Sequence, residues 1–265
     1  MIFSTPRPSL LHRSLRASLV AAVLFCCTGC LTFETLVTVR DDGSGTLEMV
    51  FALSGPMLEM ITSMAGDDDL CDEEDLQTEA DNMGEGVTLA SVESIDEGDM
   101  QGCRVFYDFA DVNQLTLSEN PPGMTPDGPT EEEEDITFSF TPGSPATLMV
   151  YLPQNFVDDP SDESPQADTT GQAQQMAVLR EMFQGAYVEM AVAVEGVITE
   201  TNASYYDDNR VTLIEMDFDT LLENEEQLEI LSAANPQSAA EAKALLEDVE
   251  GIKLETGQEV VVQFQ

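Results

Sequence analysis

The sequence is poor in basic residues, and this scarcity excludes several classes of function. Its 265 residues include nine Lys and Arg against 52 Asp and Glu. Arg7, Arg13 and Arg16 precede the first acidic residue, Glu34, so the chain beyond them holds six basic residues and a net charge of −46. A field this negative repels nucleic acids and anionic lipid head groups. We therefore exclude nucleic acid as a partner.

The sequence also lacks the side chains on which most enzymes depend. It contains no tryptophan, its single histidine is His12, and its only lysines are Lys243 and Lys253. Beyond residue 12 there is therefore no His-based triad, histidine general base or His metal ligand. No Gly-rich phosphate loop precedes a predicted helix, and no pair of carboxylates stands out among so many. We predict a protein that is not an enzyme, with no catalytic residues, no cofactor and no metal site.

The acidic residues are spread along the whole chain. This distribution favours a salt-rich environment, because the Debye length falls to about 3 Å at 1 M salt and self-repulsion is then screened. The runs 67–69, 131–135 and 207–209 supply oxygen ligands suited to calcium, but none has the spacing of an EF-hand loop. Solvated turns are the favoured interpretation of these runs, and specific cation binding is the alternative.

Residues 1–29 have the pattern of a secretory signal peptide. A basic start is followed by the apolar run 19–25 and then by Thr28-Gly29, and this run is too short for a stable membrane span. Residues 27–30, Cys-Thr-Gly-Cys, resemble the lipobox of bacterial lipoproteins, with Cys27 where that family usually has Leu. The resemblance implies a lipid anchor, such as palmitate, on Cys30. Ordinary signal cleavage is the alternative.

Two cysteines, Cys71 and Cys103, follow Cys30. An even pair in an oxidising compartment predicts a disulfide. On the chain-entropy model such a bond contributes about 3–4 kcal/mol to stability. Two buried free thiols are the alternative.

Hydrophobic periodicity predicts alternating hairpins and helices. Residues 33–40 and 46–53 flank the turn 41–45, which is a strong hairpin signal. Further strands are predicted at 86–95, 103–109, 136–140, 146–152, 187–199, 210–218 and 258–264. Helices are predicted at 57–64, 72–83, 111–117, 172–184, 219–233 and 236–250.

This order of elements predicts two similar halves after the signal peptide. Residues 30–117 form the first hairpin–helix–hairpin half, 118–135 an acidic connector, and 136–265 a second half with C-terminal helices and a last strand. The expected fold class is α+β, with antiparallel hairpins and helices packed on one face of the sheet. Short matches, such as Thr46–Leu53 with Thr147–Leu152, suggest a duplicated ββαββα unit, although unrelated hairpins share such residues.

Two stretches also carry a family resemblance. Residues 31–39 with the turn 41–46, and residues 196–203 followed by 209–212, resemble bacterial lipoproteins of the LppM type, whose domain is of uncharacterised function. The chain departs from members with a C-terminal membrane span, because residues 260–265 read as a soluble strand. The resemblance implies an envelope-anchored α+β domain that binds lipid or a partner protein and has no catalytic residues.

We therefore predict a membrane-anchored, extracytoplasmic lipoprotein that binds a partner protein or assists envelope assembly. Leu31 is not the Asp that favours inner-membrane retention in enteric-type sorting, so the outer membrane, facing the periplasm or the surface, is favoured in a cell with two membranes. One alternative is a lipid or amphiphile carrier, and a second is a cation-dependent binding module. A contiguous apolar pocket would favour the carrier, whereas a solid core would favour the partner binder.

Overall fold

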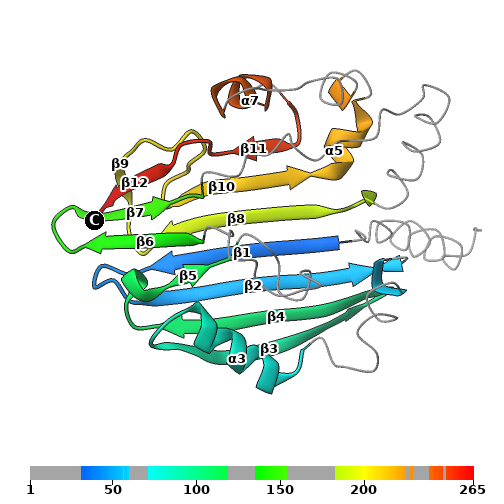
Figure 1. Cartoon of the computed structure of the whole chain (residues 1–265), viewed down its shortest axis with the longest axis horizontal. Helices are drawn as coiled ribbons and strands as arrows, with labels where there is room; N and C mark the ends of the chain where they lie inside the picture. The colour runs from blue at the N-terminus through cyan, green and yellow to red at the C-terminus, as the bar shows by residue number, and fades with distance from the viewer. Residues whose placement is uncertain are drawn as a thin grey trace, which may run out of the picture.

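A computed structural model describes residues 31–55, 57–59, 71–118, 135–153, 183–224, 227–228, 239–246 and 249–265. Their strands form two sheets (Figure 1). Sheet A has seven strands in the order β11-β10-β8-β1-β2-β4-β3, and sheet B has five in the order β5-β6-β7-β12-β9. The strands of sheet A are β1 (Leu31–Val39), β2 (Gly45–Ser54), β3 (Val87–Glu97), β4 (Met100–Phe109), β8 (Tyr187–Val194), β10 (Arg210–Asp217) and β11 (Ile252–Leu254). Those of sheet B are β5 (Thr116–Leu117), β6 (Ile136–Thr141), β7 (Ala146–Tyr151), β9 (Ile198–Thr201) and β12 (Glu259–Phe264).

The first hairpin, β1 with β2, confirms the prediction from alternating residues. Its antiparallel register runs from Leu31 opposite Leu53 to Val39 opposite Gly45. Gly45 is needed because a Cβ atom there would lie 2.0 Å from the carbonyl oxygen of Thr38. The alternation fixes which side chains share a face, and Val37, Val39 and Leu47 are all fully buried on one of them.

The two sheets pack face to face through one hydrophobic core. Inward-facing residues of sheet A, such as Val37 and Tyr107, belong to the same buried cluster as Leu148, Val150 and Val262 of sheet B. Sheet B lies at the end of sheet A toward which β1 runs (Figure 1). The opposite end of sheet A holds a second, smaller apolar cluster around Leu31, Leu53 and Ala186, with Phe51, Met57, Leu58, Phe183 and Phe218 packed against it.

The predicted α+β architecture is wrong. The described chain is mostly β, and a second sheet covers the apolar face where helices were expected. The helices of the described residues are short: α3 (Glu73–Met83), α5 (Phe218–Glu223), α7 (Ala239–Leu246) and the 3-10 helix η1 (Val112–Gln114). Of these helices, α3 adds Ala80 and Met83 to the main core, with Leu76 packed against it, and η1 adds Val112. Alternation reveals that a strand has an apolar face, but it does not reveal what covers that face.

The expected duplication also fails. The strands matched as equivalents, β2 and β7, lie in different sheets, and β5 from the first half pairs with β6 in sheet B. The predicted long strand at 187–199 is broken into β8 and β9, which also belong to different sheets. The break is at Gly196, with φ +158°, where a Cβ atom would lie 2.8 Å from the carbonyl oxygen of Gln265. Hydrophobic alternation continues through the break, so the sequence pattern did not show it.

Several smaller expectations can be compared with the structure. The helix at 72–83 is confirmed as α3, and Asp72 caps it by accepting hydrogen bonds from the backbone N–H groups of Glu74 and Asp75. The helix at 111–117 is wrong, because η1 is followed directly by β5, and β11 was not predicted. Most of the helices 57–64 and 172–184, and nearly all of the connector 118–135, lie outside the described residues.

Candidate functional site

The predicted lipid-attachment residue, Cys30, lies outside the described residues, but the next residue begins the fold. Leu31 opens β1, which is a central strand of sheet A. Its side chain is 8% exposed and belongs to the cluster that contains Leu53 and Ala186. The buried start of sheet A therefore follows the predicted attachment residue directly in the sequence.

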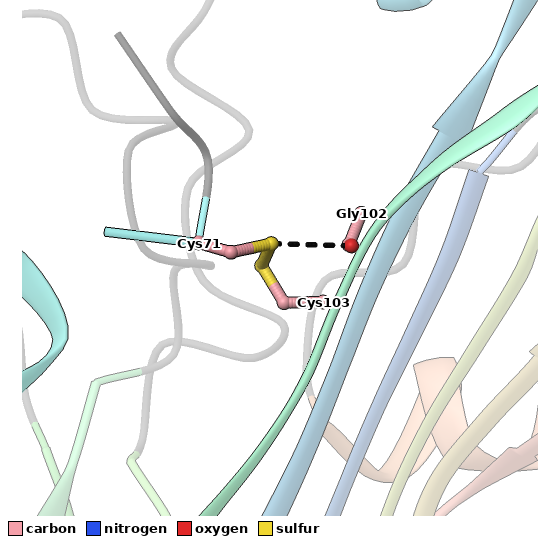
Figure 2. The surroundings of a disulfide bond; sticks show 3 residues. All are labelled: Cys71, Gly102 and Cys103. Atoms are coloured by element: carbon pink, nitrogen blue, oxygen red, sulfur yellow. Dashed lines mark hydrogen bonds between the residues drawn. A yellow bond between two sulfur atoms is a disulfide. The ribbon is translucent and has the colours of Figure 1, made fainter. Parts of the chain in front are cut away.

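Cys71 and Cys103 form a disulfide, in agreement with the sequence prediction (Figure 2). Their Cα atoms are 5.7 Å apart, within the range that a disulfide spans. The Sγ atom of Cys71 also lies 3.1 Å from the carbonyl oxygen of Gly102. The bond ties the residue just before the Asp72 cap of α3 to β4, so it fixes that helix against the sheet.

The outer face of sheet A carries a row of charged residues that the sequence analysis missed. Cross-strand register places Lys253, Glu215, Glu189 and Glu34 side by side on β11, β10, β8 and β1. Directly opposed residues of neighbouring strands have Cβ atoms about 5 Å apart, so three carboxylates are neighbours in this row. No sequence motif surrounds any of these residues, and only the cross-strand register brings them together.

Basic residues are concentrated on this same face. Lys253 Nζ lies 2.8 Å from Glu215 Oε2, and Arg210 Nη2 lies 2.7 Å from Glu189 Oε1. The side chain of Glu189 is 15% exposed, so its charge depends on this pairing more than a surface charge would. Arg104 forms a third pair, 2.5 Å from Glu48. Three of the six basic residues beyond residue 30 therefore lie on one sheet face.

Glu34 is the charged residue of this row that forms no ion pair within the described part of the chain. Burial, followed by repulsion from Glu189, raises its pKa above the usual value for Glu. Burial and the same carboxylates, Glu189 foremost, also raise the pKa of Tyr187 to about 12. With Lys253 and Arg210 paired to Glu215 and Glu189, the row thus has one surplus carboxylate, Glu34.

A second buried carboxylate, that of Glu255, holds a loop in place. Glu255 is 5% exposed, and its side chain accepts hydrogen bonds from the backbone N–H groups of Ser204 and Tyr205 and from the Ser204 hydroxyl. Its own N–H donates to the carbonyl oxygen of Leu213 at 2.8 Å. Glu255 therefore secures the loop before β10 to the strand that follows.

The acidic runs that the sequence offered as calcium ligands lie only partly within the described residues. Residues 207–209 belong to the turn before β10, whereas runs 67–69 and 131–134 lie outside the described residues. Within the described ranges, no group of three or more His, Cys, Asp and Glu side chains could hold a metal ion. No helix in the same ranges is long and apolar enough to cross a bilayer.

Comparisons with known proteins give one distant similarity. No protein-family model matches the chain, and no curated protein matches it. A structural search finds the folded domain of LppM from Mycobacterium tuberculosis, with 16% sequence identity and a TM-score of 0.33. The match covers 73% of this chain and 86% of that domain. It is a distant structural resemblance to the same type of lipoprotein domain that the sequence resembled.

Proposed function

We propose that this protein is a lipid-anchored, extracytoplasmic lipoprotein that binds a partner protein at the cell envelope. The observation that carries the proposal is the start of β1 at Leu31, directly after the lipobox-like cysteine. Because a central strand begins at the anchor, an acylated Cys30 would hold the whole β-sandwich against the membrane surface. We place it in the outer membrane where the cell has two membranes.

Partner binding is favoured over carriage of a lipid by the packing of the core. One cluster of buried residues runs through both sheets, and its central members, including Val37, Leu47, Leu148 and Val150, are fully buried. This buried core favours binding at the surface, where the outer face of sheet A and the long edge strand β3 are presented. Assistance in envelope assembly would follow from such binding.

Carriage of a lipid or other amphiphile is a second candidate, and one observation favours it. The second apolar cluster lies at the anchored end of sheet A, and Phe51, Met57 and Phe183 are only partly buried there. An acyl chain that entered the protein from the membrane would reach this cluster first. Native mass spectrometry of the purified domain tests this candidate, since a reproducible extra mass in the lipid range supports it and a mass without ligand contradicts tight binding.

The anchor is tested by metabolic labelling with an alkyne analogue of palmitate in a bacterium that expresses the full chain. We expect label on the wild-type protein, none on Cys30→Ala, and membrane fractionation of the wild type alone. Ordinary signal cleavage predicts no label on either form, and that result would overturn the anchor. Partner binding is tested in the same cells by photo-crosslinking from surface positions. The absence of specific crosslinked species from both sheets would overturn it.

A further inference from the structure

The four edge strands of the two sheets differ greatly in length. Three of them are very short: β5 has two residues, β11 has three and β9 has four. The fourth, β3, has eleven. Edge strands present unpaired N–H and C=O groups, and proteins commonly protect them by keeping them short. Among the described strands, β3 alone lacks this protection.

Within the described part of the chain, β3 has a strand partner along only one of its two edges. β4 pairs with one edge of β3, from Val87 opposite Phe109 to Glu97 opposite Met100. No described strand pairs with the other side. A register shift between Leu89 and Ser91 bends the beginning of the strand, whereas Ser91–Glu97 continues in regular register. Most side chains of this straight half are exposed.

The nearby helix does not use this edge. Ala80 and Met83 of α3 are buried in the main core together with Val105 of β4, so the helix covers the inner face of the sheet. α3 nevertheless adds to the charge at this side of the molecule, because its first turn carries Glu73, Glu74 and Asp75.

The straight half of β3 is acidic on both faces. Register places Glu93 and Glu97 on the outer face, and Asp96 points to the other. Arg104 lies opposite Glu93, but its guanidinium is engaged with Glu48. A second copy of this chain added along the edge would bring carboxylates together, which is unfavourable, whereas a strand that carries Lys or Arg would meet opposite charge.

We propose that the edge of β3 between Ser91 and Glu97 accepts an extended, basic segment of a partner protein as an added strand. This inference rests on the proposed partner-binding function and specifies its surface and chemistry. Backbone hydrogen bonds to this edge hold the segment, and its alternate basic side chains pair with Glu93 and Glu97 on the outer face. The bulge before Ser91 sets one limit of the docking register.

The test uses two synthetic peptides of about eight residues, each alternating Lys with Val or Thr, as strand-addition ligands do. The second peptide has the same sequence but is N-methylated at consecutive central residues, so neither of its edges can pair. Both are titrated into the purified mature protein, and amide hydrogen exchange locates the contact. We expect the unmethylated peptide to bind at least about tenfold more tightly and to slow exchange in residues 91–97 but not in β9.

The contribution of charge is tested with the same Glu→Gln substitution on two edge strands, β3 and β9. We expect Glu93→Gln with Glu97→Gln to weaken binding of the unmethylated peptide several-fold, and Glu200→Gln on β9 to leave it unchanged. Equal binding of the two peptides, no binding of either, or protection confined to another strand would overturn the inference. Photo-crosslinking in cells separates the two proposals. If a crosslinker at position 94 captures nothing while crosslinkers at other positions capture a specific partner, the proposed β3 docking site is wrong and the proposal of partner binding stands.

Discussion

Thr32 of β1 lies directly opposite Tyr187 of β8, and this pair begins the parallel ladder between the two strands. The ladder joins β11, β10 and β8 on one side of sheet A to β1, β2, β4 and β3 on the other. Two residues further on, the same register sets Glu34 beside Glu189. The ladder therefore both builds the centre of the sheet and creates the crowded row of carboxylates on its outer face. The stability of the fold should consequently depend on pH and salt at identifiable positions.

Glu34→Gln should stabilise the protein at neutral pH. Because the folded-state pKa of Glu34 is raised, the ionised carboxylate opposes folding, and wild-type stability increases as pH falls through that pKa toward the unfolded value. Removing a like charge from a cross-strand row is worth about 0.5 kcal/mol, or about 1–2 °C in Tm for a chain of this size. Thermal unfolding at several pH values measures it.

The advantage of Glu34→Gln should shrink as pH falls toward 4, since the wild-type carboxyl then takes up its proton. Glu200→Gln, on an exposed position of β9, serves as the control for the loss of one negative charge. An equal gain in both variants would show that the gain comes from overall net charge and not from the row.

Arg210→Gln should destabilise the protein more than Arg40→Gln. The first change leaves Glu189, 15% exposed, beside two other carboxylates without its cation, which we expect to cost about 1–3 kcal/mol. The second breaks the more exposed pair of Arg40 with Glu195, which is worth about 0–1 kcal/mol. Urea unfolding of both variants measures the difference, and a smaller loss for Arg210→Gln would contradict this view of the row.

Glu255→Gln should destabilise the loop before β10. Both oxygens of the Glu255 carboxylate accept hydrogen bonds from Ser204 and Tyr205. A Gln side chain has one accepting oxygen, and its NH2 group would face one of these donors. We expect a loss of about 1–3 kcal/mol in urea unfolding and faster exchange of the Tyr205 amide. An unchanged unfolding midpoint would show that the loop is held by its other contacts.

Loss of the disulfide should destabilise the folded state without changing its architecture. The cysteines are separated by 32 residues, and closing a loop of that size is worth about 3–4 kcal/mol on the chain-entropy model. A variant with both Cys71→Ser and Cys103→Ser should unfold at lower denaturant concentration and be insensitive to reducing agents, whereas the wild type should shift toward it on reduction. If reduction leaves the wild type unchanged, the bond does not contribute.

Local elements were predictable where a short pattern decides the structure. The hairpin of β1 and β2 follows from alternating residues around a Gly-containing turn, and α3 begins at the Asp72 cap. The disulfide follows from an even pair of cysteines in a chain that was predicted to be exported. The break between β8 and β9 was not predictable, because the residues on both sides of Gly196 keep a strand-like pattern while the chain crosses from one sheet to the other.

By itself, the sequence determined the acidic character of this protein, the pairing of two cysteines and the local hairpins. Those features depend on composition or on residues close together in the chain. Only the tertiary structure decided that a second sheet covers the first, that Glu34, Glu189 and Glu215 form one row, and that β3 is a long edge among the described strands. The physical reason is that strand order and register arise from packing between distant segments, which a pattern of alternating residues does not encode.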